Sequence, residues 1–240
     1  MSTLKNKVYK ICSDVASEYP GWEFLSSGQF KNKSLKYLTL GINPGFSFAL
    51  NNTPLQPSVH IYHKKSMALF KKLSGYDQPT SIVRFQTVPQ MLTHMPEGLR
   101  RLCWIMGDKN LQINVAQPSE EAREKMIDVT ESLPILRAMM ADGISLIEKL
   151  YHLDSEESFL RNFPPKYVTR SDMIPYDEFE RKKGMMVCIV RALTGDFDFA
   201  GKYRDDSYST VYPKNMKEID SLLEIMPELE TQFHKKSNVV

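Results

Sequence analysis

Several features that would assign a function directly are scarce in this sequence. Its 240 residues include only 11 glycines, and these do not follow the spacing of a phosphate-binding loop or a dinucleotide-binding turn. No kinase pattern, nucleophile elbow or RNA-recognition octapeptide occurs. No apolar run approaches the ~20 residues of a membrane span, and no apolar stretch follows the first lysines as a secretory signal would require. We therefore expect a soluble, cytoplasmic protein that does not enter a membrane.

Cysteine is also scarce. The three cysteines, Cys12, Cys103 and Cys188, are far apart, odd in number and surrounded by apolar neighbours. This pattern is typical of buried free thiols in a reducing compartment. A catalytic Cys–His pair is the alternative, but no local signature supports it.

The overall composition is average for a globular protein, but charge is distributed unevenly along the chain. Hydrophobic residues make up 42% and charged residues 25%, which allows a sizeable core. Residues 1–116 hold 14 lysines and arginines against 6 acidic residues, a net charge of +8, and residues 117–240 hold 17 against 23, a net charge of −6. This division indicates either an acidic partner for the basic half or attraction between the halves within one fold.

The first half predicts one helix followed by strands. Leu4, Val8 and Val15 recur at helical spacing within residues 3–19. Short β-rich segments then predict strands over residues 22–25, 35–42, 59–63, 82–88, 101–106 and 111–115. Asn43-Pro44-Gly45 predicts the turn of a hairpin over 35–50, and a second hairpin is expected over 101–115. A loop over 51–57 and a short helix over 67–73 complete this half.

The second half predicts helices. Ser119 is a good N-cap for a helix that extends to Leu133, where Pro134 breaks or kinks it before an apolar stripe continues to about Tyr151. Asp154 with Glu157 then resembles a capping box for a short helix. Two longer helices follow, one over Asp177–Thr194 that should be central and buried, and one from Pro213 that is interrupted at Pro227.

These elements predict an α+β fold. An N-terminal helix and a mostly antiparallel sheet come first, and a helical half packs on or beside them. The change in pattern near Gln117-Pro118 indicates a boundary between residues 1–116 and 117–240, which form two subdomains or one integrated domain. Neither an internal repeat nor a low-complexity segment interrupts this layout.

The acidic residues after the predicted central helix are the main candidates for catalysis. Asp196 and Asp198 directly follow the helix-ending Gly195, and Asp205 and Asp206 lie shortly beyond. Paired carboxylates can hold a magnesium ion or transfer protons. Carboxylates at a helix end more commonly cap the backbone or face solvent, so these four residues are weak candidates.

Histidines do not predict a metal site. His60 and His63 lie on one predicted strand, where side chains alternate, so they should point to opposite faces. His94, His152 and His234 occur in unrelated contexts. We therefore expect no metal, and the sequence implies no cofactor.

A basic surface with interleaved aromatic residues is the strongest binding feature. It comprises Lys31, Lys33, Lys36, Tyr62, His63, Lys64, Lys65, Lys71 and Lys72. Lysines beside aromatic rings can bind phosphate backbones and stack bases, or they can bind an acidic protein. The alternative is that these lysines only solvate sheet edges and prevent aggregation.

Three functions follow from these observations. The leading hypothesis is a non-enzymatic binding or regulatory protein that acts on another protein, because catalytic constellations are missing and charge is divided. The order of elements is similar to that of small cytoplasmic immunity-type proteins of bacteria, in which a helix–sheet scaffold binds and blocks one partner; no motif carries this resemblance, so it assigns no residues. The alternatives are an enzyme that uses the acids of residues 196–206 and nucleic-acid binding by the basic half.

Overall fold

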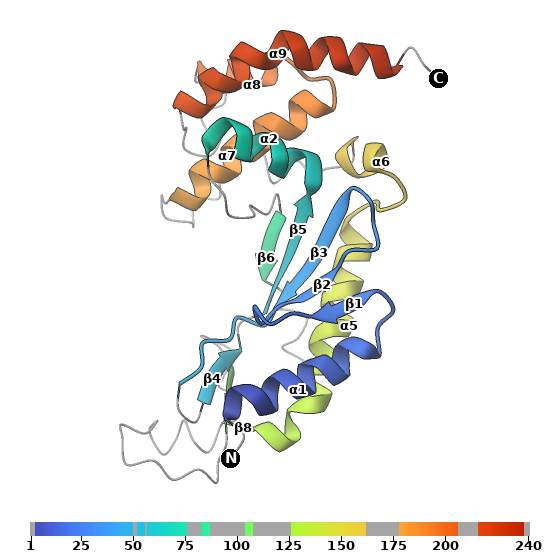
Figure 1. The fold of residues 1–240 in the computed structure, drawn as a ribbon, viewed down its shortest axis with the longest axis vertical. Coiled ribbons are helices and arrows are strands. Elements are labelled where there is room, and N and C mark those ends of the chain that lie inside the picture. The colour runs from blue at the N-terminus through green and yellow to red at the C-terminus, as the bar shows by residue number, and fades with distance from the viewer. Residues whose placement is uncertain are drawn as a thin grey trace. The chain divides into compact units, whose positions relative to one another are not determined.

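Contacts within the computed structural model divide the chain into two compact units (Figure 1). The structure describes residues 3–49, 52–55, 57–75, 83–86, 104–107, 126–161, 178–205 and 216–237. The sheet unit comprises Met1–Ile61 and Arg84–Leu150, and the helical unit comprises Tyr62–Val83 and Tyr151–Val240. The predicted boundary at residues 116/117 lies outside the described residues and stays a prediction.

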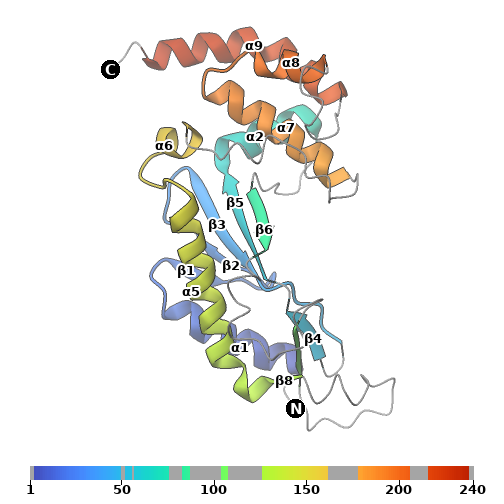
Figure 2. The ribbon, with the colours of Figure 1, turned by 180° about the vertical axis from the view of Figure 1, so that it is seen from behind.

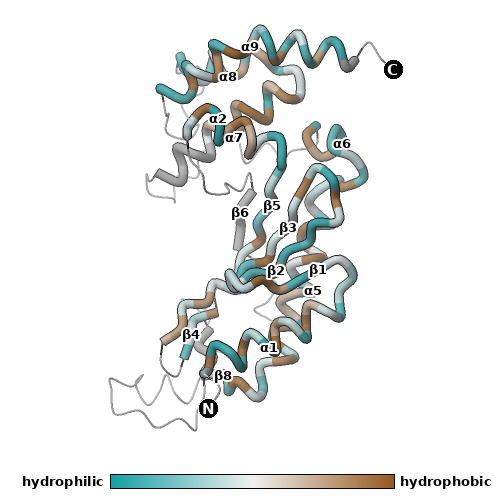
Figure 3. The backbone as a smooth tube through the Cα atoms, viewed as in Figure 1, coloured by the Kyte–Doolittle hydropathy of each residue, from teal (hydrophilic) through white to brown (hydrophobic). Residues whose placement is uncertain are grey.

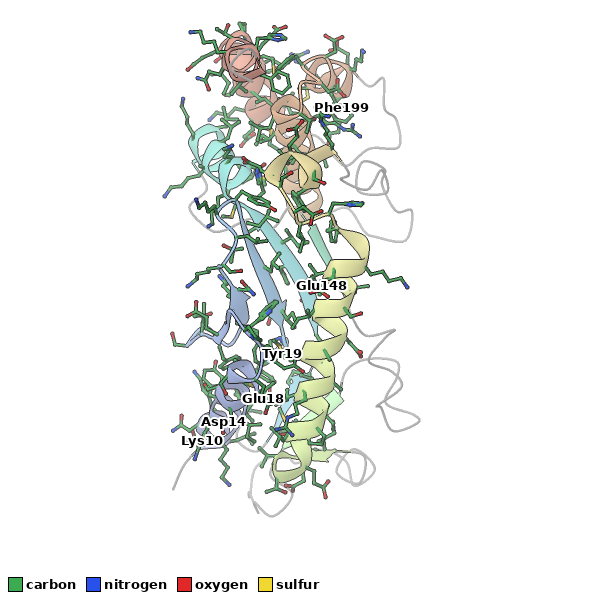
Figure 4. The ribbon with its side chains drawn as sticks, turned by 90° about the vertical axis from the view of Figure 1, so that its right-hand side faces the viewer. Lys10, Asp14, Glu18, Tyr19, Glu148 and Phe199 are labelled. Carbon is green, nitrogen blue, oxygen red and sulfur yellow. The ribbon has the colours of Figure 1, made fainter. Side chains whose placement is uncertain are left out.

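The sheet unit begins with helix α1, Leu4–Ser17, as the apolar spacing predicts. Thr3 caps the helix, because its hydroxyl oxygen accepts the backbone N–H of Asn6 at 3.3 Å. Leu4, Val8, Cys12, Val15 and Ala16 form the buried side. Lys10, Asp14 and Glu18 recur every four residues along an exposed side, where Figure 4 labels them.

Five strands form the larger sheet in the order β1-β2-β3-β5-β6. Their bounds are Trp22–Phe24, Phe30–Asn32, Leu38–Asn43, Ser58–His63 and Val83–Gln86. The first three form an antiparallel meander in which Phe24 lies opposite Phe30 and Phe30 lies opposite Ile42. Gly28 in the first turn has a φ of 82°, and a Cβ there would lie 2.8 Å from the Tyr9 hydroxyl, so the turn requires glycine.

A second, three-stranded sheet lies entirely within the sheet unit. It has the order β4-β7-β8, with bounds Asn52–Leu55, Trp104–Gly107 and Ile127–Asp128. Strands β4 and β7 are antiparallel, whereas β7 and β8 are parallel. Three of the four strand pairs whose direction is described are therefore antiparallel.

Helix α5, Ser132–Leu150, runs along one face of the larger sheet (Figure 2). The short 3₁₀ helix η2, Val129–Glu131, precedes it. Gly143 of α5 lies so near β3 that a Cβ would be 2.6 Å from Cδ1 of Ile42. Nε and Nη2 of Arg137 in α5 donate hydrogen bonds to the Glu18 carboxylate, and the Tyr19 hydroxyl donates to the Arg137 carbonyl, so these contacts attach α5 to the end of α1.

The helical unit is built around α7, Glu178–Leu193. Every residue from Met185 to Val190 is buried, and this run is brown in Figure 3. The helices α2 (Lys64–Ser74), α8 (Phe199–Arg204) and α9 (Met216–Ser237) all pack against α7, and α6 (Glu156–Arg161) belongs to the same unit. Gly195 ends the α7 segment with a φ of 89°, as its position in the sequence predicts.

Several predicted elements of the first half differ in the structure. Residues 44–49 form no strand, so the hairpin over 35–50 is absent; β3 pairs instead with β2 and β5. Residues 52–55 form strand β4 rather than a loop, because β4 pairs with β7. The second arm of the predicted hairpin over 101–115 lies outside the described residues. Non-local pairing, which no local pattern encodes, decides the first two cases.

Three further differences lie in the second half of the chain, and two of them concern prolines. Pro134 is the third residue of α5 and neither breaks nor kinks it. Backbone N–H groups in the first turn of a helix have no acceptor within the helix, so a proline, which lacks this group, loses no hydrogen bond there. Residues 126–131 form a bend, β8 and η2 instead of the predicted helix. Pro227 lies inside the continuous helix α9, so the predicted interruption is wrong. Packing of α9 against α7 and α8 offsets the lost backbone hydrogen bond.

The predicted α+β class is confirmed: an N-terminal helix and an antiparallel sheet precede a mostly helical second half. Within the described part of the chain, no helix is long and apolar enough to cross a membrane.

Candidate functional site

His63 stands where β5 ends and α2 begins. Its side chain is completely buried, and its Nδ1 accepts the backbone N–H of Ser66 at 3.3 Å, which makes it the N-cap of α2. The Ser66 hydroxyl lies 2.6 Å from the same nitrogen. The sequence His63-Lys64-Lys65-Ser66 therefore starts the helix three residues earlier than the apolar spacing predicts.

The other ring nitrogen of His63 contacts α6. Nε2 lies 2.9 Å from Oε1 of Glu156, and the second carboxylate oxygen of Glu156 lies 2.5 Å from Nζ of Lys65. Ser155 caps α6 by accepting the backbone N–H of Ser158 at 3.0 Å, so the predicted cap at Asp154 is wrong. The Glu156 carboxylate thus joins the beginnings of two helices.

These contacts set the protonation states. A backbone N–H can only donate, so Nδ1 of His63 is the acceptor nitrogen and Nε2 carries the proton given to Glu156. Burial lowers the pKa of His63 and the charge of Lys65 adds to this, although Glu156 opposes it. Burial raises the pKa of Glu156, but hydrogen bonds from Lys65 and His63 outweigh burial, and the net pKa is lowered. The expected state is a neutral imidazole beside an ionised carboxylate.

The trio of Ser66, His63 and Glu156 contains the residue types of a hydrolytic triad but not its access. The Ser66 side chain is fully buried, so a substrate cannot reach its oxygen without unfolding the start of α2. Its hydroxyl contacts the ring nitrogen that also accepts the cap. We call these three hydrogen-bonded residues the His63 node. His63 and Ser66 are buried within it, and Glu156 also lines a pocket.

That pocket is a concavity of about 470 Å³ within the helical unit. Residues of α2, α6, α9 and the end of α7 line it. The polar and charged lining consists of Lys65, Glu156, Glu157, Arg161, Thr194 and Gln232. The apolar lining consists of Leu160, Ala192, Leu193, Leu229 and Phe233. The volume falls within the range of ligand-binding sites, ~300–1,000 Å³.

The charged groups of the pocket are paired with one another. Lys65 contacts Glu156, and Arg161 contacts Glu157 at 2.6 Å one helical turn away. The Thr194 hydroxyl donates to the Arg191 carbonyl, and the Gln232 amide donates to Glu228. A smaller hollow of about 240 Å³ shares Leu160, Arg161 and Thr194 with the pocket. The site therefore offers an apolar surface bordered by ion pairs.

Helix α2 presents what we call the lysine face. It consists of Lys64, Lys65, Lys71 and Lys72, all exposed on one side of the helix, and α2 contains no acidic residue. Lys65 belongs to both the lysine face and the pocket. Two of the four lysines stand in the first turn, where the helix dipole disfavours cations, so helix stability alone does not account for them.

The predicted basic surface is distributed over both units. In the sheet unit, Lys31 lies on β2 opposite Glu23, Lys33 forms an ion pair with Glu23 at 2.5 Å, and Lys36 is exposed between β2 and β3. The lysine face lies in the helical unit. Tyr62 and His63 are buried, so their rings do not offer stacking surfaces.

The predicted acidic candidates are not brought together into a metal or catalytic centre within the described residues. Asp196, Asp198 and Asp205 are all exposed. Asp198 pairs with Lys202 at 3.6 Å, and Asp205 lies 3.5 Å from Arg204. Asp206 lies outside the described residues. The part of the chain that the structure describes contains no group of three histidines, cysteines or carboxylates placed to hold a metal ion.

Sequence reasoning found His63 and Lys65 but missed their partner. Glu156 is 93 positions from His63 and has no local signal beyond its place at a helix start. The pocket residues of α9, such as Gln232 and Phe233, are also unmarked in the sequence. Only the approach of distant helices defines this site.

Comparison of the chain with protein-family models, with curated proteins and with solved structures finds no match. The function is therefore inferred from the geometry of the site.

Proposed function

We propose that this protein is a non-enzymatic binding or regulatory protein, and that the pocket and lysine face of the helical unit form its partner-binding surface. The observation that carries this proposal is that the pocket and the lysine face meet at Lys65. This residue lines the apolar pocket and also stands on a helix face of four lysines. Apolar pockets bordered by charge are typical of protein-recognition surfaces.

The state of the polar groups supports binding over catalysis. Glu156 is the titratable group that links the pocket to the buried His63, and both of its oxygens are engaged. The hydrogen bonds from Lys65 and His63 lower the pKa of Glu156, which makes the carboxylate a weaker base, and an effective general base needs the opposite shift. The exposed carboxylates of Asp196, Asp198 and Asp205 do not converge on a shared site in the structure.

Affinity capture from an extract of the source cells tests the proposal with matched variants. Gln232→Trp fills the pocket from an exposed helix position, and Glu230→Trp places the same ring on α9 outside the pocket lining. We expect one protein to co-purify stoichiometrically with the wild type and with Glu230→Trp but not with Gln232→Trp. Equal recovery with both tryptophan variants, or no stoichiometric protein at all, contradicts the proposal.

The lysine face needs its own pair of variants. Lys71→Glu with Lys72→Glu reverses two charges of the face, and Lys5→Glu with Lys10→Glu makes the same charge change on the exposed side of α1. The captured protein should be lost with the first pair and retained with the second. The comparison separates a local contact from a general effect of net charge.

A further inference from the structure

We infer that the partner presents an acidic segment that carries one or two large apolar side chains, which enter the pocket while the carboxylates lie along the lysine face. This inference rests on the binding function proposed above and assigns the chemistry of the partner. It commits to a protein segment as the occupant.

The apolar part of the inference follows from the lining of the pocket. Leu160, Leu193, Leu229 and Phe233 supply aliphatic and aromatic surface from three different helices. A concavity of about 470 Å³ can admit more than one side chain of the size of leucine or phenylalanine. Desolvated apolar anchors in such pockets provide most of the affinity at protein interfaces.

The acidic part follows from the charges beside the pocket. Lys64 and Lys71 are seven residues apart, so the lysine face extends over about two helical turns, roughly 11 Å. Helix α2 itself contains no acidic residue, and Lys65 is paired with Glu156 of α6. Carboxylates spaced along a partner segment can follow this row, because complementary charge fixes register and accelerates association.

The same surface argues against a nucleic acid. The pocket that Lys65 borders also contains the carboxylates of Glu156 and Glu157, which repel a phosphate backbone. Glu224, Glu228 and Glu230 are exposed on α9, which also lines the pocket. Phe233 is only partly exposed and contacts both Phe197 and His234 edge to face, so its ring is less open to a stacked base. A segment with discrete carboxylates can avoid these acids, whereas a continuous row of phosphates cannot.

Four fluorescent probes test the inference against the full-length protein by anisotropy. The first is a synthetic helical peptide of about 15 residues with glutamates around a leucine–phenylalanine pair. As a helix it is roughly 22 Å long, which exceeds the ~16 Å of α2. The second replaces the apolar pair by serines, and the third replaces the glutamates by lysines. The fourth is a single-stranded oligonucleotide of similar length.

We expect the first peptide to bind, and to bind about tenfold more weakly when its apolar pair is replaced by serines. Binding should weaken by a similar factor in Lys71→Glu with Lys72→Glu and in Gln232→Trp, and by less than about twofold in Glu230→Trp. Added salt should weaken binding without abolishing it, since the apolar contact is insensitive to screening. Circular dichroism spectra of the variants confirm that they are folded.

Each remaining outcome contradicts the inference. Equal affinity for the serine peptide shows that the pocket is not used, and tighter binding of the lysine peptide reverses the assigned charge. Tighter binding of the oligonucleotide than of the first peptide assigns the surface to nucleic acid. Binding of no probe overturns the assigned chemistry alone, because the capture experiment with the tryptophan variants tests the binding function separately.

Discussion

Nε2 of His63 donates a hydrogen bond to Oε1 of Glu156 at 2.9 Å, across 93 positions of the chain. The bond joins the residue that caps α2 to the first turn of α6. Because Glu156 also contacts Lys65 and lines the pocket, the buried imidazole holds one wall of the proposed binding surface. The stability of the helical unit and the shape of the surface should therefore depend on this residue.

Replacing His63 should destabilise the protein. His63→Ala removes the cap of α2 and the hydrogen bond to Glu156, and it leaves a cavity in a fully buried position. We expect the free energy of unfolding to fall by roughly 2–4 kcal/mol, as measured by urea denaturation. His234→Ala, at an exposed position of α9, is the control and should be near neutral. A loss for His63→Ala no larger than for His234→Ala would show that the node is not structural.

The same histidine should make stability depend on pH. Burial lowers the pKa of folded His63 below 6.5, so in the window beneath that value the unfolded chain binds the proton more strongly. The free energy of unfolding should fall as pH decreases through 6.5, and this contribution should level off below the folded pKa. Urea denaturation at closely spaced pH values between 8 and 5 measures the effect.

His63→Gln serves as the control for that titration, because glutamine does not titrate. The decline of stability just below pH 6.5 should be smaller in this variant. Glu156 contributes in a different window: its pKa is lowered, so its share of stability is present above 4.5 and is lost as pH falls through the folded value. An identical pH profile for the wild type and His63→Gln would remove His63 as the cause.

A glycine in the sheet unit offers a test of helix–sheet packing. Alanine usually stabilises a helix relative to glycine by roughly 0.5–1 kcal/mol, but a Cβ at Gly143 would lie 2.6 Å from Cδ1 of Ile42. We expect Gly143→Ala to destabilise the protein by about 1–2 kcal/mol. Ile42→Val removes the clashing methyl, so the double variant should be more stable than the sum of the single effects by at least ~0.5 kcal/mol. Additive effects in thermal or urea unfolding would contradict the close contact.

The buried cysteines should be unreactive in the folded protein. Cys12 and Cys188 are fully buried, and burial raises the pKa of the Cys188 thiol to about 12 and that of Cys12 further. Because the thiolate is the reactive form, a thiol reagent should modify neither at neutral pH until the protein unfolds. The measurement uses a Cys103→Ser background, since Cys103 lies outside the described residues. Rapid labelling of either thiol in the native variant would contradict the burial.

Local patterns were sufficient for the elements whose contacts are local. The apolar spacing of α1, the run from Met185 to Val190 in α7, and the end at Gly195 follow from side-chain periodicity and from the backbone freedom of glycine. Strand β4 could not be predicted in this way, because its partner β7 lies about fifty residues further along the chain and supplies its hydrogen bonds. The interruption predicted at Pro227 is wrong for the opposite reason: packing of α9 outweighs the local tendency of proline to break a helix.

The candidate site divides in the same manner. The lysine face is a property of one helix, so its four lysines could be named from the sequence. The pocket could not be predicted from the sequence, because it is formed by residues of α2, α6, α7 and α9. No motif connects Glu156 with Thr194 or Gln232. The burial of Tyr62 and His63 likewise follows only from tertiary packing.

The most direct test of the proposed binding surface places a photoactivatable cross-linking residue at position 232, which lines the pocket, and compares it with position 230 on the same helix. The full-length protein is irradiated in the source cells, and the adducts are separated by mass. A single adduct with another protein at position 232, absent at 230 and lost when Lys71→Glu and Lys72→Glu are added, is the predicted result. The same adducts at both positions, or none at position 232, would contradict it.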